Sequence, residues 1–326
     1  MSTSLTIEET AAWLMDRDNF LILTHRRPDG DTVGCAGALA QGLREAGKAA
    51  FVLRNPETTA RYLRFVEDYW AYDGYTPDHV IIVDTAAYDL FPINGDGFIG
   101  NVSLSIDHHP SNTHYAQLCC HDETRAACGE IIYELLLALS GSISAKSAEH
   151  LYAALSTDTG CFAFANTTAN TLRVASFLIE AGAPHRELNR LLFRTKTRSR
   201  ISIEGMINSG LEFYFGGKAA ISVITIEMME SANADEDDVD DIASIPGIVQ
   251  GVLAGITIRE MASTNDCKVS VRTSPMVNAH EICKLFGGGG HAMAAGFTLE
   301  KPVADTKTAL LEVLHNFFPE EMEQDK

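Results

Sequence analysis

The sequence predicts an α/β protein with two domains: a larger N-terminal one, built on a mostly parallel sheet with flanking helices, and a smaller C-terminal α/β one. Its 326 residues, 46% of them hydrophobic, can form two separate cores. Short apolar runs alternate with helical segments in the first half, and this βαβ alternation favours parallel strands buried on both faces. Beyond Gly210, patterns typical of strands predominate. We expect the domains to cover residues 1–186 and 211–326, joined by a helical connector at 187–210.

Capping residues and apolar runs in the sequence predict where the helices and strands of the first domain lie. Thr6 and Glu9 form a capping box that begins a first helix. The apolar run Phe20–Leu23 predicts a short buried strand, and the next helix contains Gly34 and Gly37, which let its backbone lie close to the sheet. The other predicted elements are strands at 49–53, 80–83 and 102–106 and helices at 32–46, 59–66, 129–139, 145–156 and 168–181.

Ligand-type side chains follow the first strand. His25, Asp29 and Asp31 come directly after it, with Pro28 and Gly30 producing a tight turn between them. Ligands in open α/β sheets bind beyond the carboxyl ends of the strands, so chemistry is expected at this point. A histidine and two carboxylates there indicate a metal site.

Two further strands end in the same kind of residue. Asp84 follows the next clear apolar run, and Asp107, His108 and His109 follow the one after it. A single aspartate after a strand is usually a turn former or a helix cap. Because three predicted strands are each followed by carboxylate or histidine residues, a common metal site is the favoured interpretation.

Asp158 lies in the segment S-T-D-T-G, directly after a predicted helix. It could simply end that helix. Gly160 and the small threonines beside it suit a close approach to a bound ion, however. We therefore expect Asp158 to be a fourth carboxylate of the site.

The second domain is marked by strand patterns at 211–215, 219–226, 252–259 and 268–273. Arg272 lies in the last of these, and Gly287–Gly290 lead into His291. A glycine run usually marks a flexible turn, but consecutive glycines also let backbone N–H groups approach a phosphate. Before a histidine and small residues, this run indicates a pocket wall. The acidic run Asp235–Asp241 is interpreted as a solvated loop or the start of a helix.

The composition limits the classes of function. A net charge of −19 argues against a general DNA or RNA coat protein, whose binding surface is normally basic. Seven cysteines, an odd number without C-x-x-C pairs, favour a reducing compartment, and we expect a cytoplasmic protein. Cys119, Cys120 and His121 are too few for a zinc site, so these cysteines are interpreted as buried thiols. No apolar run approaches a membrane span, and no membrane partner is expected.

The segment from His185 to Gly210, which contains the predicted connector, has a pattern that predicts a helix with little apolar alternation. Basic residues recur there in an otherwise acidic chain, at Arg186, Arg190, Arg194, Lys196, Arg198 and Arg200. Two interpretations stay open. The segment is either a solvated basic face that offsets the acidic body or a surface that attracts substrate.

Five ordered motifs extend over nearly the whole chain: T-H-R-R-P-D-G-D, V-D-T, D-H-H, T-D-T-G and G-G-G-G-H-A-M-A-A-G. Together they resemble the DHH phosphoesterases that carry a C-terminal DHHA1 domain. Within these, the chain is similar to the stand-alone bacterial oligoribonucleases called nanoRNases, which also act as phosphatases on 3′-phosphoadenosine 5′-phosphate (PAP). Residues 1–186 would be the DHH domain and 211–326 the DHHA1 domain. Cys35 follows Gly34, where the family often has a serine. This difference could change how the helix packs, but it removes no expected ligand.

The resemblance implies two divalent cations that share one bridging carboxylate. The first would be held by His25, Asp29 and Asp84, and the second by Asp31, Asp84, His108 and Asp158. Carboxylates and imidazoles favour Mn²⁺ over a thiolate-preferring ion. Two such cations would neutralise a phosphoryl group and supply a nucleophile. Asp107 would orient a ligand histidine, and His109 would face the phosphate as a donor.

The resemblance also implies that the second domain caps the first and holds the far end of a short nucleotide. The residues implied are Arg272, Gly288, Gly289, Gly290 and His291. The scissile phosphate would then lie over the metals. The closed end of such a cleft would admit only a few nucleotides.

The expected activity is that of an Mn-dependent phosphodiesterase that hydrolyses short RNA or DNA oligonucleotides or dinucleotides to mononucleotides, and PAP to AMP. Type II inorganic pyrophosphatases share the N-terminal motifs but lack the G-G-G-G-H signature. A phosphodiesterase specific for cyclic di-AMP or its linear product, and a non-catalytic dinucleotide receptor, are further alternatives. The preferred substrate and the presence of a homodimer stay open.

Overall fold

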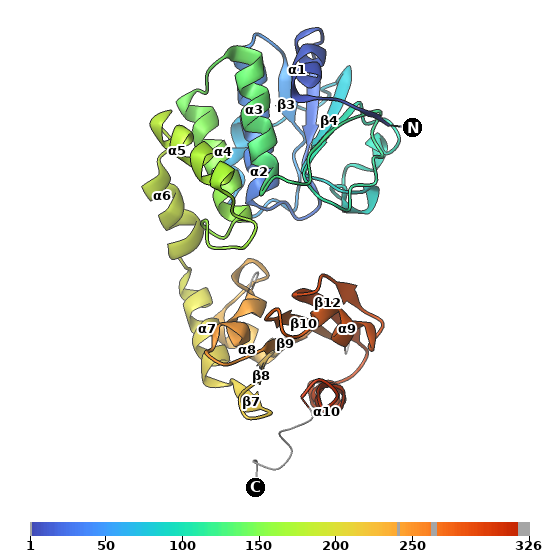
Figure 1. Cartoon of the computed structure of the whole chain (residues 1–326), viewed down its shortest axis with the longest axis vertical. Coiled ribbons are helices and arrows are strands. Elements are labelled where there is room, and N and C mark those ends of the chain that lie inside the picture. The colour runs from blue at the N-terminus through green and yellow to red at the C-terminus, as the bar shows by residue number, and fades with distance from the viewer. Residues whose placement is uncertain (1, 240–241, 262–265, 319–326) are drawn as a thin grey trace. The chain divides into compact units, whose positions relative to one another are not determined.

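The computed structural model describes residues 2–239, 242–261 and 266–318 (Figure 1). The chain divides into two compact units, Met1–Thr195 and Lys196–Lys326. The division falls within the predicted connector at 187–210, so that segment contributes helices to both units. Each unit has its own sheet and its own hydrophobic core.

The first unit contains a six-stranded sheet in the order β1-β6-β5-β4-β2-β3, and every neighbouring pair is parallel. Its strands are β1 (Thr3–Ser4), β2 (Phe20–Leu23), β3 (Ala50–Val52), β4 (His79–Val83), β5 (Leu104–Asp107) and β6 (Leu118–His121). All four residues of β2 are apolar because the strand is buried on both faces of the sheet. Phe20 and Ile22 belong to the core beneath the helices, whereas Leu21 and Leu23 belong to the core on the opposite face. The predicted parallel sheet is confirmed.

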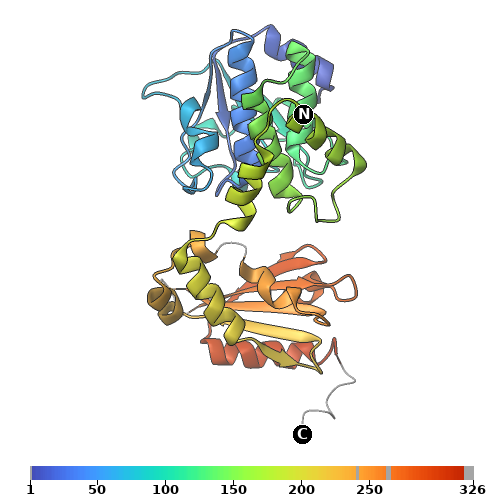
Figure 2. The ribbon, with the colours of Figure 1, turned by 90° about the vertical axis from the view of Figure 1, so that its left-hand side faces the viewer.

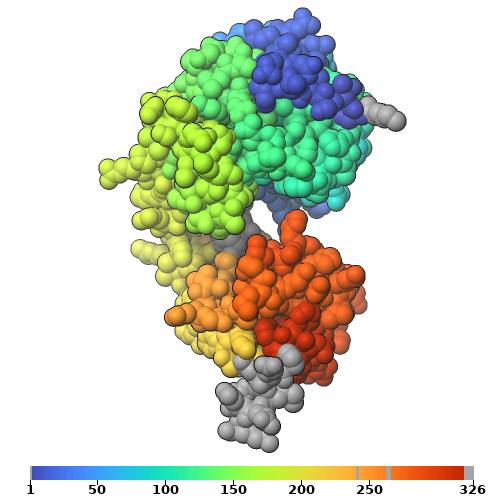
Figure 3. Space-filling model, in the orientation of Figure 1, coloured from blue at the N-terminus to red at the C-terminus, as the bar shows by residue number. Residues whose placement is uncertain are grey.

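Helices cover one face of this sheet. They are α1 (Ile7–Met15), α2 (Gly30–Glu45), α3 (Cys128–Ser140), α4 (Ala145–Asp158), α5 (Ala169–Glu180) and α6 (His185–Asn189), which continues as a π-helix over Arg190–Arg194. α2 and α4 lie very close together: a Cβ atom on Gly34 would come within 2.5 Å of the His150 carbonyl oxygen. In the space-filling view, the N-terminal segment and α3 lie side by side on the surface of this unit (Figure 3).

The other face of the sheet is covered by irregular segments with short 3-10 turns, at Tyr88–Leu90 and Asp96–Phe98. The predicted α-helix at 59–66 is wrong. Two 3-10 turns, Leu63–Phe65 and Glu67–Tyr69, stand there instead. Phe65 and Tyr69 are buried with their rings against His150, so short turns that aim these two rings inward replace a regular helix.

The second unit contains a mixed sheet in the order β11-β12-β10-β9-β8-β7, in which only β8 and β9 pair in parallel. Its strands are β7 (Glu212–Tyr214), β8 (Ala219–Ile224), β9 (Ala254–Glu260), β10 (Cys267–Thr273), β11 (Gly289–Gly290) and β12 (Ala294–Leu299). Its helices are α7 (Arg198–Ser209), α8 (Ile226–Ala232), α9 (Ala279–Lys284) and α10 (Val303–Leu314), with 3-10 helices at Asp237–Val239 and Ile242–Ile248. Of the acidic run, Asp240 and Asp241 lie outside the described residues.

Helices pack on the second sheet through two separate cores. α9 and α10 contribute Ile282 and Leu310 to the core that contains Val269 of β10 (Figure 2). α7 contributes Ile203 and Ile207 to a smaller core with the 3-10 segments. Among the described residues, no helix combines the length and the apolar character that crossing a membrane requires.

Candidate metal centre

The polar residues expected at the strand ends do meet at one edge of the first sheet. His25 lies two residues beyond β2, Asp84 directly follows β4, and Asp107 ends β5, and these three strands are neighbours. Parallel neighbours bring their carboxyl ends to the same edge. Asp29 is the N-cap of α2 and Asp31 lies in its first turn, whereas Asp158 is the last residue of α4.

A first group of possible metal ligands consists of His25, Asp29 and Asp84. The His25 Nε2 atom lies 3.5 Å from Asp29 Oδ1 and 3.8 Å from Asp84 Oδ2. The other ring nitrogen, Nδ1, is 2.8 Å from the Arg26 carbonyl oxygen. A carbonyl oxygen only accepts, so Nδ1 carries the proton and Nε2 keeps a free lone pair toward the carboxylates.

A second group consists of Asp31, His108 and Asp158. The His108 Nε2 atom lies 3.8 Å from Asp31 Oδ2, 3.7 Å from Asp158 Oδ2 and 3.5 Å from Asp84 Oδ1. His108 Nδ1 is 3.1 Å from the Arg125 carbonyl oxygen, which directs Nε2 inward just as for His25. A third group joins Asp84 and His108 to His109. Asp84 therefore connects the groups.

Asp84 is almost completely buried, and its Oδ1 atom has no hydrogen-bond partner. Burial, together with the charges of Asp31 and Asp29, raises the pKa of Asp84 well above its usual value. A buried carboxylate oxygen without a donor is costly unless a cation satisfies it. Oxygen and imidazole donors from six residues around this atom fit hard or borderline divalent cations.

The metal-free protein is expected to lose stability as the pH rises from about 4 to about 8. Burial and the nearby Asp31 and Asp29 carboxylates raise the pKa of Asp158 to about 8 from 3.8. Between these values the unfolded chain has released a proton that the folded protein still binds, so stability present at low pH is lost on raising the pH. A tenfold difference in proton affinity between the two states corresponds to about 1.4 kcal/mol of stability.

Urea unfolding with a chelator present, at both ends of this pH range, measures the effect. Asp158→Asn should lose less stability than the parent, because the amide does not titrate. Saturating Mn²⁺ should remove most of the difference between the two proteins. A parent whose stability falls no more steeply than that of the variant would contradict the assignment.

Asp31 is fixed by donors from a neighbouring helix. Its Oδ2 accepts from the Cys128 backbone N–H at 2.7 Å, and its Oδ1 accepts from the Gly129 N–H at 3.0 Å, both at the start of α3. The Cys35 thiol donates to Oδ1 at 3.2 Å. The Cys35 thiol thus supports a ligand-type carboxylate as a serine hydroxyl would.

The second histidine of the D-H-H motif is bound by the aspartate of the motif. Asp107 Oδ1 lies 2.7 Å from His109 Nδ1, and Asp107 Oδ2 accepts from Asn112 Nδ2 at 2.5 Å. This contact with Asp107 raises the pKa of His109. Asp107 was expected to orient a ligand histidine, but it contacts His109, and the ring of His108 is instead oriented by a backbone carbonyl.

In the second unit, Arg272 is half-buried on β10, on the face opposite Val269 and Val271. Its guanidinium donates to the Val271 carbonyl oxygen at 3.1 Å, and no ion pair joins it to a carboxylate among the described residues. An arginine on a sheet face without an acidic partner is available for an anionic ligand.

The glycine run is partly a strand rather than a free loop. Gly289 and Gly290 form β11 and pair with β12. A Cβ atom on Gly288 would lie 2.3 Å from the Gly296 carbonyl oxygen, and Gly290 has a φ of 139°. Close packing against β12 therefore requires glycine at positions 288 and 290, whereas a Cβ atom on Gly289 would meet no neighbour within 4 Å. His291 follows in the exposed turn between the two strands.

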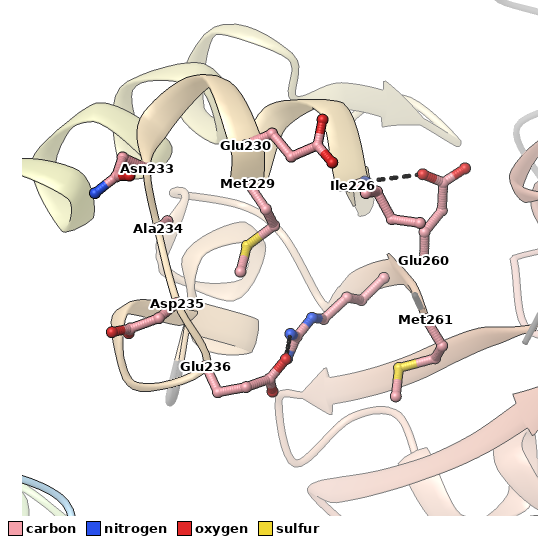
Figure 4. Close-up of a pocket in the computed structure, with 10 residues that line it drawn as sticks. Ile226, Met229, Glu230, Asn233, Ala234, Asp235, Glu236, Glu260 and Met261 are labelled. Carbon is pink, nitrogen blue, oxygen red and sulfur yellow. Dashed lines mark hydrogen bonds and ion pairs between the residues drawn. The ribbon is translucent and has the colours of Figure 1, made fainter. Parts of the chain in front are cut away.

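A cavity of about 610 Å³ in the second unit lies between α8, the turn at 233–236 and the end of β9 (Figure 4). Arg259 and Glu236 form an ion pair in it, and Glu260 accepts from the Ile226 N–H at 3.0 Å. None of the predicted metal-binding, catalytic or substrate-binding residues lines this cavity.

Family models match a large part of each unit. The model described as "DHH family, N-terminal domain" matches residues 19–155, and the one described as "DHHA1 domain" matches residues 216–320. The bifunctional oligoribonuclease and PAP phosphatase NrnA of Thermus thermophilus is 33% identical over 283 residues, which cover 86% of this chain and 83% of that protein. This chain belongs to the DHH family. The resemblance predicted from the five motifs is confirmed.

Two further comparisons are consistent with this assignment. The NrnA of Bacillus subtilis is 29% identical over 309 residues, covering 91% of this chain and 95% of that protein. The crystal structure of an exopolyphosphatase-related protein from Bacteroides fragilis superimposes with a TM-score of 0.86 at 20% identity, covering 96% of each chain. That likeness shows a shared fold across both units.

Several residues of the DHH site carry no signal that sequence reasoning could use. The Arg125 carbonyl and the Cys128 and Gly129 N–H groups act through the backbone, which every residue has. Only a weak indication in the sequence suggested that Asn112 belongs to the site, namely its position three residues beyond the D-H-H motif. Its role depends on a turn that returns its amide to Asp107.

Proposed function

We propose that this protein is a metal-dependent phosphodiesterase that hydrolyses short oligonucleotides or dinucleotides to mononucleotides and PAP to AMP. The observation that carries the proposal is the convergence of six ligand-type residues around the unsatisfied Asp84 oxygen. The activities for which the two NrnA relatives are named, oligoribonuclease and PAP phosphatase, favour these substrates over pyrophosphate.

The six residues would hold two divalent cations, with Mn²⁺ the favoured ion because the donors are oxygens and imidazoles. His25, Asp29 and Asp84 would hold the first, and Asp31, Asp84, His108 and Asp158 the second. When bound there, such cations neutralise phosphate charge and lower the pKa of water. The carbonyls of Arg26 and Arg125 keep the two ligand imidazoles in the required tautomer.

His109 would act on the phosphate itself. With Nδ1 directed to Asp107, only Nε2 remains to donate a proton or a hydrogen bond. The raised pKa keeps the ring protonated over a wider pH range, which suits a donor to a phosphoryl oxygen that gains charge in the transition state. Asp107 acts through His109 and is a positioning residue.

A panel of substrates assayed with Mn²⁺ tests the function. Short RNA, linear dinucleotides, cyclic di-AMP, PAP and pyrophosphate should separate the alternatives, with short RNA, dinucleotides and PAP turned over fastest. Fast turnover of cyclic di-AMP alone would identify a cyclic-dinucleotide phosphodiesterase. Equilibrium binding of dinucleotides without any turnover in Mn²⁺ would identify a receptor and refute the proposal.

Arg272, with Gly288, Gly289, Gly290 and His291, would bind the part of the substrate away from the metals. Arg272→Ala is expected to lower kcat/KM on a dinucleotide by about 10 to 100-fold, the worth of a charge-assisted hydrogen bond. A small activated phosphodiester that reaches only the metals should be hydrolysed as fast as by the parent. Arg272→Lys should also be impaired, because it cannot grip a phosphate bidentately.

The control for Arg272 is Lys268→Ala, which removes an exposed cation from the same face of β10. It should leave both substrates unaffected. If Arg272→Ala lost activity equally on the dinucleotide and on the small phosphodiester, the binding role would be wrong.

We also propose that the protein works in the cytoplasm. The seven cysteines are all free thiols, and six of them are buried. Unpaired thiols in this number favour a reducing compartment. Detection of intermolecular disulfides in protein taken directly from cells would argue against this location.

A further inference from the structure

A second anionic-ligand site is indicated at the end of the first unit. α6 and the π-helix that continues it border a cavity of about 330 Å³, lined by His185, Arg186, Asn189, Arg190 and Arg194. α6 lies at the outer edge of the unit beside α4 and α5 (Figure 1). The cavity is large enough for a nucleotide-sized ligand.

The three arginines of this cavity, Arg186, Arg190 and Arg194, are exposed. No ion pair involves any of them within the part of the chain that the structure describes. The adjacent Glu187 forms its ion pair with Arg64 at 2.8 Å, and this contact, with a smaller contribution from the charge of Arg190, lowers the pKa of Glu187. Arg190 also donates to the Thr195 hydroxyl at 3.4 Å. In a chain of net charge −19, three arginines that line one cavity form a local positive potential.

The spacing of the arginines indicates what they bind. Arg186, Arg190 and Arg194 recur every four residues, which places them in a row along one side of the helix. At the α-helical rise of about 1.5 Å per residue the row would extend about 12 Å, and the wider π-helical turn at Arg190–Arg194 makes it somewhat shorter. A single phosphate would need donors that converge, whereas a row of this length matches several phosphates in succession. Rare π-helical turns also occur frequently at functional sites.

The row adjoins the segment that follows the metal-ligand candidate Asp158. The His185 ring lies 6.2 Å from that of Tyr152, and Tyr152 lies 5.8 Å from Phe162. Tyr152 and Phe162 thus connect His185, at the start of α6, with the segment that follows Asp158. A strand that leaves the metal centre on this side would meet the arginines.

We propose that Arg186, Arg190 and Arg194 form a sequence-independent site for the phosphate backbone of substrate strands longer than a dinucleotide. The site rests on the proposed function, and it extends the range of substrates beyond those that the metal centre alone can hold. For these three arginines it favours substrate attraction, whereas Lys196 and Arg200 of the same basic segment form ion pairs with Glu204. A dinucleotide has a single internucleotide phosphate, which is too few to engage both the metal centre and a row of three arginines.

The test neutralises the row in the triple variant R186Q/R190Q/R194Q and compares an RNA pentamer with a dinucleotide. On the pentamer, kcat/KM is expected to fall at least 10-fold at low salt, with the dinucleotide little changed. The logarithmic salt dependence should become shallower by about 2, since each phosphate contact on a single strand contributes about 0.7. The triple variant R61Q/R173Q/K301Q, which removes the same charge from exposed positions elsewhere, should behave as the parent.

Fluorescence anisotropy with a non-cleavable 2′-O-methyl pentamer separates this site from the proposed activity, because it needs no turnover. Weaker pentamer binding by the row variant alone supports the site even if no substrate is cleaved. Equal losses on pentamer and dinucleotide, or equal losses in both triple variants, would overturn it. So would pyrophosphate that binds the parent as tightly as the pentamer and loses that binding in the row variant, since the row would then be a small-anion site.

Discussion

Asp84→Asn is expected to bind less than one Mn²⁺ per chain at concentrations that give the parent two. Within the described parts of the chain, Asp84 is the one carboxylate that faces both candidate histidine ligands, His25 and His108, at 3.8 Å and 3.5 Å. Replacing it with a neutral amide removes a donor and a negative charge from both metal positions at once. Loss of several kcal/mol of charge stabilisation corresponds to a fall in kcat/KM on the order of 10³-fold.

The metal-free form of this variant should be as stable as the parent or more so. Burial and two neighbouring carboxylates already disfavour the ionised Asp84, so a neutral amide of the same shape relieves repulsion. Elemental analysis and thermal unfolding with a chelator give the two readouts. Asp89→Asn, an exposed change five residues further on, is the matched control. Two bound metals in Asp84→Asn would refute the bridging role.

His109→Gln is expected to retain both metals and lose about 10² to 10³-fold in kcat, the worth of one donor to a developing negative charge. Its ring is bound by Asp107 and protonates more readily than usual, so its loss removes a transition-state donor. His108→Gln should instead lose metal, because Nε2 of His108 faces three carboxylates.

Metal content and single-turnover rates of the two histidine variants decide between these roles. Asn112→Ala should resemble a mild form of His109→Gln, since Asn112 holds Asp107 in place. If His109→Gln lost metal and His108→Gln retained it, the assignment within the D-H-H motif would be reversed.

The parallel sheet and the position of its site could be predicted because one physical rule connects them. Uninterrupted apolar runs specify strands buried on both faces, and the carboxyl ends of parallel neighbours meet at one edge. Asp84 and His108 could therefore be placed together from sequence, although they lie far apart along the chain. Their shared group in the structure follows from the pairing of β4 with β5.

The remaining features depend on tertiary contacts that leave little local pattern. β6 was not predicted, because Cys119 and Cys120 give no strand alternation, although both are buried as expected. β11 and β12 were missed because Gly289 and Gly290 have low intrinsic strand preference and pair only through the partner strand. The partner of Asp107 could not be chosen from sequence, since both histidines lie within two residues of it.

The ligand candidates come from widely separated parts of the chain, from His25 to Asp158, and from three strand ends and two helix ends. An unfolded chain cannot bring them together, so cations would bind the folded state alone and slow its unfolding. At a free cation concentration of 100 times the Kd, mass action adds about 2.7 kcal/mol to the free energy of unfolding. Metal starvation would therefore shorten the life of the protein in the cell as well as stop its chemistry, and its abundance would follow the supply of the ion.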